Sequence, residues 1–228
     1  MSHAPTTNFV TAKSKQTFER VLSAATNLFL TKGFAATTMR DISRESDLGL
    51  GALYYYCRSK EELVLLFYER INEEILQSAL SAPVQAKTLP EAFGAFMHLK
   101  LERLAPYRQL LIVVLKESVD PESPVSPLNG STASTRNKSI QFFEELVRRF
   151  NKGDQAGTAA KLLWLIHMAI IAFWLYDRSC DFESTFKKLI PAVVQIGTWA
   201  KPLNGMPRFR MVRDKLILSV LDILAERP

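Results

Sequence analysis

Cysteine and histidine are scarce in this chain of 228 residues, which contains two cysteines and three histidines. Cys57 and Cys180 lie far apart without a metal-ligand spacing, so the sequence predicts free thiols in a reducing, cytoplasmic setting. No histidine is paired with a cysteine or carboxylate at the spacing of a metal site or catalytic triad, and no Gly-rich phosphate loop occurs. These absences predict a protein that is not an enzyme and that needs no cofactor.

A hydrophobic run long enough to cross a bilayer is also missing. Residues 162–176 are apolar except for His167, and these fifteen residues fall short of the roughly 20 that a membrane span requires. The first dozen residues are small and polar, unlike a secretory signal. We therefore expect a buried helix that is apolar on all sides, and no association with a membrane.

Strand-like alternation of apolar and polar residues is absent, whereas apolar residues recur at three- and four-residue spacing along most of the chain. With 47% hydrophobic residues, the chain can bury a sizeable core. The sequence predicts an all-α protein with about ten helices. Besides two short helices between residues 38 and 56, the predicted helices cover residues 14–32, 60–79, 89–104, 107–117, 135–151, 156–178, 182–200 and 207–227.

Proline and glycine mark the interruptions. Pro121, Pro124, Pro127 and Gly130 fall within residues 120–138, which predict a long polar loop that is functional or disordered, with disorder favoured. Pro191 predicts a kink or a boundary in the helix of residues 182–200.

Residues 34–63 carry the signals of a helix-turn-helix. Thr38 is predicted to cap one short helix together with Asp41, and Asp47-Leu48-Gly49 supplies a turn that tolerates positive φ. A second short helix follows at residues 51–56, and Ser59 with Glu62 forms another capping box before a long helix. Two short helices joined by such a turn place a recognition helix in the major groove of DNA.

These motifs, with Gly51-x-Leu53-Tyr54 and Ser59-Lys60-Glu61-Glu62-Leu63, resemble the DNA-binding domain of the tetracycline-repressor (TetR) family of transcriptional regulators. The resemblance covers residues 14 to about 67. It implies a flexible arm at residues 1–13, an N-terminal three-helix helix-turn-helix domain at residues 14–59, and a hinge helix followed by a C-terminal helical ligand-binding and dimerisation bundle at residues 60–228. Three positions depart from the family pattern, namely Asp47, Gly49 and Cys57.

Basic charge is concentrated in the same part of the chain. Residues 1–60 contain eight Lys or Arg and four Asp or Glu, a net charge of +4 out of +6 for the whole chain. Leu53 and Tyr54 are expected to face inward. The resemblance places Tyr55 and Tyr56 where a groove-facing pair lies and Lys60 where a lysine binds phosphate. The residues predicted to contact a double-stranded DNA operator are Thr38, Arg40, Leu50, Ala52, Tyr55, Tyr56 and Lys60.

The remaining part of the chain is rich in large apolar side chains, which suit a small apolar or aromatic effector held by one or two polar contacts. The residues predicted to bind it are Phe93, Phe96, Met97, Tyr107, Phe143, Trp164, His167, Met168 and Ile171. His98 is a further polar candidate. An aromatic stripe at helical spacing is more often plain core, and a histidine on an apolar face is more often hydrogen-bonded core than a ligand contact.

Dimerisation follows from the helix that is apolar on all sides, because its second face must be buried. We expect a homodimer through Ala156–Tyr176 and the segment from Phe182 to Ala200. The function predicted is a ligand-responsive DNA-binding regulator, a repressor that acts as a homodimer on a palindromic operator. The alternative is an all-α carrier of apolar small molecules without a DNA-binding role. The operator, the effector and the direction of its effect on DNA binding stay open, as do the role of residues 120–138 and whether residues 207–227 join the dimer.

Overall fold

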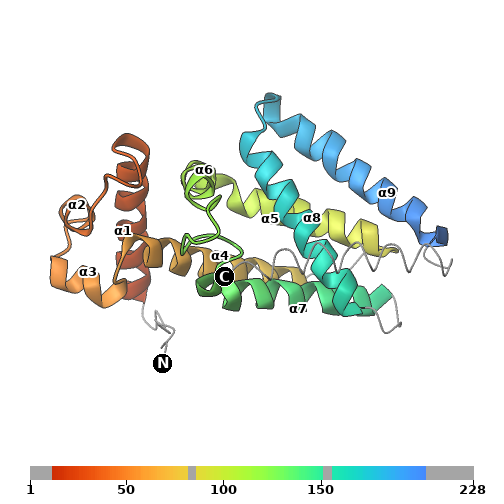
Figure 1. Ribbon diagram of the computed structural model, residues 1–228, viewed down its shortest axis with the longest axis horizontal. Helices are drawn as coiled ribbons and strands as arrows, with labels where there is room; N and C mark the ends of the chain where they lie inside the picture. The colour runs from red at the N-terminus through yellow and green to blue at the C-terminus, as the bar shows by residue number, and fades with distance from the viewer. Residues whose placement is uncertain (1–11, 82–85, 151–155, 204–228) are drawn as a thin grey trace.

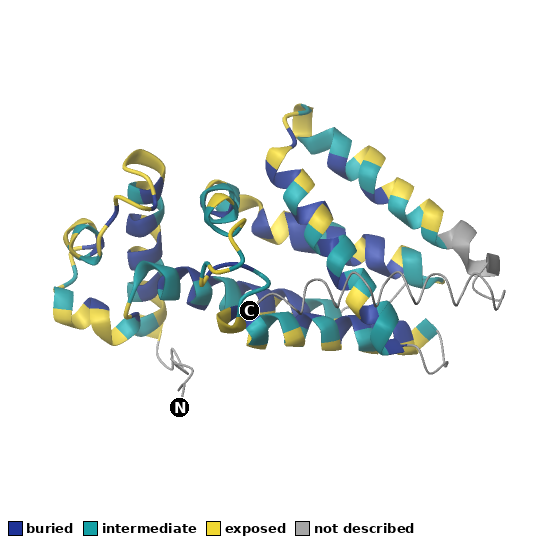
Figure 2. Cartoon of the chain, viewed as in Figure 1, coloured by how far each residue is buried: buried dark blue, intermediate teal, exposed yellow. Residues whose placement is uncertain are grey.

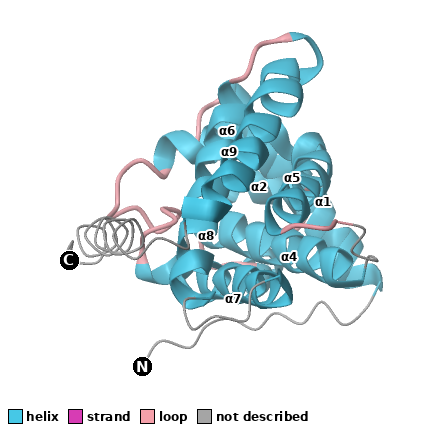
Figure 3. Cartoon of the chain, turned by 90° about the vertical axis from the view of Figure 1, so that its right-hand side faces the viewer, coloured by secondary structure: helices cyan, strands magenta, loops and turns pink. Residues whose placement is uncertain are grey.

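The computed structural model describes residues 12–81, 86–150 and 156–203, without the side chains of residues 198–203. All regular structure in these residues is helical (Figure 3), which confirms the all-α prediction. The α-helices are α1 (Ala12–Thr31), α2 (Met39–Glu45), α3 (Leu50–Tyr56), α4 (Lys60–Ser81), α5 (Leu89–Leu104), α6 (Arg108–Glu117), α7 (Ala133–Phe150), α8 (Ala156–Tyr176) and α9 (Ile190–Leu203). Short segments η1 (Ala105–Tyr107), η2 (Gly130–Thr132), η3 (Cys180–Phe182) and the π-helical η4 (Ser184–Leu189) connect them.

The helices form a small N-terminal group and a larger C-terminal group (Figure 1). α1, α2 and α3 pack together, and α4 runs from this group into the cluster of α5 to α9. Within the larger group α7 packs along α8, and α9 packs against α5. The N-terminal helix-turn-helix followed by a helical bundle is therefore the observed architecture. The division of the chain at residue 60 stays a prediction.

The apolar core of the N-terminal group is continuous with that of the larger group. α1 buries Phe18, Val21, Leu22, Ala25 and Phe29, which recur at the three- and four-residue spacing of one helix face. Buried side chains from α2, α3, the residue after α3 and the start of α4 complete this core, and they are Ile42, Leu53, Cys57 and Leu63. The short helices α2 and α3 therefore owe their order to packing on α1, because helices of seven residues are marginal in isolation.

Residues 118–132 are ordered, and the predicted disorder of residues 120–138 is wrong. The Arg136 guanidinium donates to the carbonyls of Pro127 and Asn129 at 2.8 and 3.2 Å. The Asn129 side-chain amide donates to the carbonyl of Pro121 at 3.3 Å, and Val125 is buried in the core. α7 also begins at Ala133, so the last six residues of the predicted loop are helical. Composition could not reveal this order because it comes from specific hydrogen bonds within the segment and from the burial of Val125.

The two ends of the chain lie largely outside the described residues. The predicted arm covers residues 1–13, of which Ala12 and Lys13 are the first two residues of α1. The predicted helix of residues 207–227 lies outside the described residues. The predicted break at Pro191 corresponds to the transition from the π-helical η4 to α9, whose first turn contains this proline. Because η4 and α9 are contiguous, Pro191 lies within a continuous helical run and marks a change of helix type in place of a break.

α8 has 21 residues and is, within the described residues, the helix whose length and composition would allow a membrane span. One face of α8 packs into the bundle, with Trp164, His167 and Trp174 buried. The opposite face is partly exposed and includes Phe173 and Tyr176 (Figure 2 colours the chain by burial). The prediction of a helix buried on all sides therefore holds for only one of its faces in a single chain.

Two helices connect the larger group to the N-terminal group. Arg70 of α4 forms an ion pair with Glu19 of α1, and the centroid of the Phe67 ring lies 4.7 Å from that of Tyr107 in η1, just before α6. α6 itself packs on both α1 and α8. The Arg108 side chain in its first turn donates to the carbonyls of Leu175 and Asp177 at 2.9 Å. The end of α8 is therefore coupled through α6 to α1.

A chain of polar side chains crosses the middle of the larger group. Lys100 of α5 is 1% exposed, and its ammonium donates to Asn72 Oδ1 of α4 at 2.9 Å. Asn72 Nδ2 donates to Ser139 Oγ of α7 at 3.2 Å. His167 of α8 is buried nearby, and burial and the Lys100 charge hold its pKa well below the ordinary value, so its ring is neutral. Lys100 is therefore a buried basic group without a carboxylate partner among the described residues, which is unfavourable for its charged form.

Lys100→Met is expected to raise the free energy of unfolding. Burial lowers the pKa of Lys100 to about 7 from the ordinary 10.5, so the unfolded chain binds the proton more tightly than the folded protein. Wild-type stability should consequently rise as the pH increases from about 7 to about 10.5, and the variant should lack this rise. At pH 7 we expect a gain of about 1–4 kcal/mol, as when buried ionic groups are replaced by apolar ones. Urea unfolding at several pH values measures both effects, and a variant less stable than the wild type at neutral pH contradicts them.

Candidate functional site

The first helix of the helix-turn-helix begins at a complete capping box. Thr38 Oγ1 accepts from the Asp41 N–H at 3.2 Å, and the Asp41 carboxylate accepts from the Thr38 N–H at 2.9 Å. Asp41 also pairs with Lys32 and Arg44, and chiefly the Lys32 hydrogen bond holds the pKa of Asp41 well below its ordinary value. The predicted start of this helix is confirmed. Two of the basic residues near the helix-turn-helix are thus already paired with a carboxylate.

The turn and the second helix present a compact surface. Asp47 adopts a φ of 48°, as predicted for the turn, and Gly49 precedes α3 without a side-chain capping bond. Within α3, Leu53 is fully buried whereas Tyr55 is 80% exposed. Tyr54 is 47% exposed, so the prediction that it faces inward is wrong. α3 therefore faces the core through a single fully buried leucine, and Tyr54 and Tyr55 are exposed to solvent.

The residues predicted to contact DNA differ in exposure. Thr38 and Arg40 are exposed at the start of α2, and Ala52 is exposed on α3 together with Tyr55. Leu50 and Tyr56 on the same helix are partly buried. The rings of Tyr55 and Tyr56 meet edge to face with centroids 5.7 Å apart. Packing against Tyr56 restricts the Tyr55 side chain, which lowers the entropy that binding must overcome.

Lys60 lies at the start of α4 with its ammonium directed into the protein. It donates to the carbonyl of Phe34 and to those of Ala35 and Thr37 at 3.1 and 3.2 Å. These carbonyls belong to the connection between α1 and α2. Lys60 therefore fixes α4 to the helix-turn-helix, and its predicted contact with phosphate stays a prediction.

Lys60→Met is expected to destabilise the protein by about 1–3 kcal/mol, because three carbonyls lose a charged donor. In the protein that remains folded, DNA binding near the wild-type level is the result for a lysine that serves only these carbonyls. Urea unfolding and gel shift at a temperature where both proteins are folded measure the two effects. Lys87→Met, an exposed lysine between α4 and α5, is the control. Weakened DNA binding at unchanged stability would instead assign Lys60 to a phosphate contact.

The second capping box, at the start of α4, is only partly as predicted. Ser59 Oγ accepts from the Glu62 N–H at 3.1 Å, but the Glu62 carboxylate accepts from the Arg58 N–H and not from Ser59. Cys57, just before it, is buried, and burial raises the pKa of its thiol to about 12. A thiol with such a pKa is protonated at neutral pH and behaves as a small apolar side chain.

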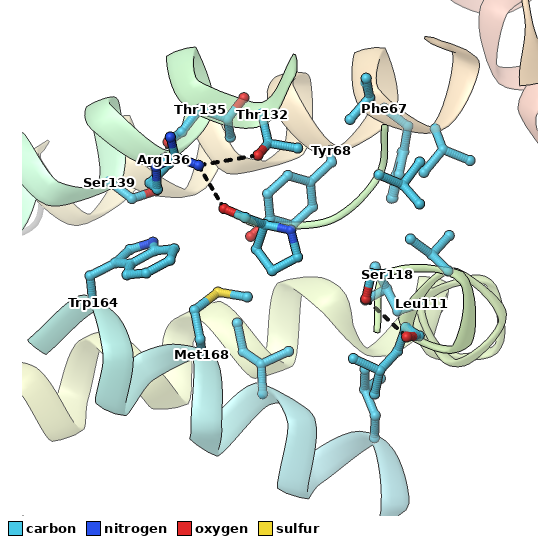
Figure 4. A pocket seen from close by; sticks show the side chains of 18 residues that line it. Phe67, Tyr68, Leu111, Ser118, Thr132, Thr135, Arg136, Ser139, Trp164 and Met168 are labelled. Carbon is cyan, nitrogen blue, oxygen red and sulfur yellow. Dashed lines mark hydrogen bonds between the residues drawn. The ribbon is translucent and has the colours of Figure 1, made fainter. Parts of the chain in front are cut away.

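A cavity of about 120 Å³ lies between α4, α6, α7, α8 and the loop after α6 (Figure 4). Most of its wall is apolar, and the exceptions are Tyr68, Ser118, Thr132, Thr135, Arg136 and Ser139. Burial raises the pKa of Tyr68 to about 12, so the phenol is protonated. An engineered cavity of about 150 Å³ accepts benzene, so this cavity has room for roughly one ring.

The structure places three of the nine predicted effector contacts in the cavity wall, namely Trp164, Met168 and Ile171. Tyr107 lies outside the wall and packs on Phe67. The other predicted residues form core around the polar chain of Lys100 and are Phe93, Phe96, Met97, Phe143 and His167. His167 Nδ1 lies 3.2 Å from the Trp164 carbonyl. His98, the further polar candidate, stacks against Phe186, with ring centroids 5.1 Å apart.

Sequence reasoning missed the polar wall of the cavity. Thr132, Thr135, Arg136 and Ser139 recur at three- and four-residue spacing, which is the signal of one helix face. These residues fall at the end of the segment predicted to be disordered, so no helix face was predicted for them. Among the described residues, no group of His, Cys, Asp or Glu side chains could hold a metal ion.

A capped helix-turn-helix with an exposed second helix, joined to a helical bundle that encloses a small cavity, defines a ligand-responsive class of DNA-binding proteins. Comparison with protein families agrees with this class of DNA-binding protein. Residues 21–66 match the model of bacterial regulatory proteins of the tetR family, and residues 93–198 match a tetracyclin repressor-like C-terminal domain. The chain belongs to the tetR family. This membership confirms the resemblance predicted from the motifs and places the chain among regulatory proteins, not enzymes.

Similar curated proteins are also HTH-type transcriptional regulators. YfiR of Bacillus subtilis is 40% identical over 141 residues, which cover 60% of this chain and 63% of YfiR. QacR of Staphylococcus aureus is 25% identical over 135 residues, which cover 58% of this chain and 70% of QacR. The match to YerO of Bacillus subtilis, 29% identical over 111 residues, covers 46% of this chain and only 37% of YerO.

Solved structures share the fold at low identity. A TetR-family regulator from Syntrophomonas wolfei aligns with a TM-score of 0.61 and 22% identity, covering 80% of this chain and 93% of that one. The fatty acid degradation regulator FadR from Bacillus halodurans aligns with a TM-score of 0.63 and 14% identity, covering 78% and 94%. A complex of SmeT with triclosan aligns with a TM-score of 0.61 and 19% identity, covering 80% and 91%.

Proposed function

We propose that the protein is a ligand-responsive transcriptional repressor that binds a palindromic double-stranded DNA operator as a homodimer in the cytoplasm. The observation that carries the proposal is the exposed tyrosine surface of α3, held on a capped helix-turn-helix whose connecting helix α4 also lines a cavity. A carrier of apolar molecules would need the cavity but not the exposed surface of α3. Because α4 both follows the helix-turn-helix and lines the cavity, it supports regulation of DNA binding by a ligand in the cavity.

In this proposal α3 enters the major groove. The Tyr55 and Tyr56 phenols donate to phosphate or meet a thymine methyl, while Leu50 and Ala52 make apolar contacts with base edges. Thr38 and the free N–H groups at the start of α2 meet a backbone phosphate, and Arg40 adds a charged contact. Because α3 has no Asn, Gln or Arg, the shape of the DNA contributes to its selectivity.

The dimer forms through the outer face of α8 together with α9. Ala169, Phe173 and Tyr176 are exposed on α8 at three- and four-residue spacing, and Ile196 is exposed on α9. Large apolar side chains exposed in a row on one helix support an interaction surface there. A two-fold axis through this face would bring the same residues of both subunits together, as a closed dimer requires.

Effector binding acts through the helices that line the cavity. Val64, Phe67 and Tyr68 place α4 in the cavity wall, and Leu111 and Val114 do the same for α6. Both helices also contact α1, through Arg70–Glu19 and through the packing of α6. An effector larger than one ring must displace one of these helices or the loop after α6. The displacement shifts the population towards an arrangement in which the two recognition helices no longer fit successive grooves.

A gel shift with the DNA flanking the protein's own coding region tests this function. The expected result is a complex that persists in the presence of excess random competitor DNA at a stated salt concentration. This complex should dissociate when a cavity ligand is added. A protein that binds small molecules without any sequence-selective DNA complex would instead be the carrier.

A further inference from the structure

The cavity wall carries charge of a single sign. Arg136 is the one charged side chain among the described residues that line it, and no carboxylate does. Figure 4 shows Thr132, Thr135, Arg136 and Ser139 together on the side of α7. The walls formed by α6 and α8 are apolar apart from Ser118 next to α6, with Leu111, Leu115 and Ile171 among them. The cavity therefore has one polar, positively charged end and one apolar end.

A second basic group, the Lys100 amine, lies directly behind this polar end. Ser139, which lines the cavity, accepts from Asn72, and Asn72 accepts from the buried Lys100 ammonium. An ammonium has three N–H donors, and in the described part of the chain Asn72 is the acceptor that Lys100 reaches. No Asp or Glu of the described residues forms an ion pair with Lys100. Lys100 thus stands two hydrogen bonds from the cavity without a counter-charge.

Arg136 also keeps donors for a ligand. Its Nη1 donates to the carbonyls of Pro127 and Asn129, and the described hydrogen bonds involve none of its other nitrogens. A guanidinium offers five N–H donors in a fork that matches a carboxylate. Within a partly enclosed cavity of low dielectric, charge interactions are stronger than in water. An anionic group at the α7 wall would be stabilised by Arg136 directly and by Lys100 through its field.

We propose that the cavity binds an amphipathic anion, with a carboxylate or comparable acidic head at the α7 wall and an apolar ring or short chain between α6 and α8. The inference rests on the proposed function, because it names the chemical class of the effector. The volume of about 120 Å³ sets the apolar part at roughly one ring before any helix moves. The head group contacts Arg136 and Ser139, and Lys100 is a positioning residue that acts through Asn72 and Ser139.

Three probes with one skeleton and different head groups test the proposal. 3-Phenylpropionate is anionic, 3-phenylpropionamide is neutral and 3-phenylpropylamine is cationic. Calorimetric titration of the full-length protein without DNA should give an affinity at least about tenfold higher for the anion than for either analogue. Arg136→Met should remove most of this preference, and Arg136→Lys should restore part of it. Lys100→Met should reduce it, whereas Lys116→Met, which removes an exposed charge on α6, should leave it unchanged.

Several outcomes overturn the proposal. They are equal or tighter binding of the amide or amine, an anion preference that survives in both Arg136→Met and Lys100→Met, and no binding of the anion at any soluble concentration. The wild-type ranking of the three probes decides the question even if a variant fails to fold. DNA binding is measured separately and without ligand. A missing anion preference with an intact DNA complex rejects only the effector class, whereas a missing DNA complex rejects the proposed function.

Discussion

Tyr55→Ala is expected to weaken operator binding by about tenfold to a hundredfold while the protein stays folded and dimeric. The side chain is 80% exposed on α3, so its removal leaves no hole in the core. A lost groove contact costs about 1–3 kcal/mol, which corresponds to this range of affinity. Gel shift titration with a labelled operator measures the effect, and circular dichroism with sedimentation verifies the fold and the dimer.

Two further variants help to interpret the effect of Tyr55→Ala. Tyr55→Phe keeps the ring and removes the hydroxyl, so it separates an apolar contact with a base from a hydrogen bond to phosphate. Leu80→Ala alters another exposed apolar side chain, at the far end of α4, and should leave DNA binding unchanged. Full affinity of Tyr55→Ala would show that α3 does not enter the groove through this residue. Loss of the fold would show that the tyrosine cluster is a packing element.

Phe173→Glu is expected to convert the dimer into monomers and to abolish stable operator binding. Phe173 is 46% exposed in the single chain and lies in the middle of the apolar face of α8. A two-fold interface contains the substitution twice, and each buried carboxylate would lack a partner. The dissociation constant of the dimer should rise by at least about a hundredfold, which corresponds to roughly 2.7 kcal/mol. Sedimentation equilibrium measures the constant directly.

Val119→Glu is the matched control for the dimer. Val119 is 75% exposed after the end of α6, so it is even more accessible than Phe173, and a carboxylate there should alter neither assembly nor DNA binding. A monomeric Phe173→Glu protein that still binds the operator at full affinity would separate dimerisation from DNA binding. A dimer that persists in Phe173→Glu would move the interface to another surface.

The helix-turn-helix could be predicted from the sequence because its signals are local. Thr38 and Asp41 form their capping box within four residues, and the positive φ of Asp47 follows from one turn. The inward position of Leu53 follows from its spacing on a short helix. Tyr54 was misplaced because a seven-residue helix that packs on one side buries a single row of side chains.

The cavity could not be located in the same way. Periodicity identifies Phe93, Phe143 and Trp164 as buried, but it does not tell which buried side chains border an empty space and which fill the core. Arg136 lies in the cavity wall, where its guanidinium donates to the carbonyls of Pro127 and Asn129 in the loop after α6. Those contacts depend on where the loop folds back, and composition alone indicated disorder. The helix-turn-helix was therefore predictable from local signals, whereas the position of the cavity largely was not.

The most direct test of the account is a footprint of the wild-type protein on genomic fragments selected for binding. The prediction is a protected inverted repeat whose half-sites are separated by about 10–10.5 base pairs or a multiple of this, contacted in successive major grooves by the two copies of α3. Addition of the cavity's ligand should change the protection without altering the dimer. Uniform binding to all fragments, with no enriched repeat and no response to ligand, would contradict the central claim that this protein is a ligand-responsive reader of a specific operator.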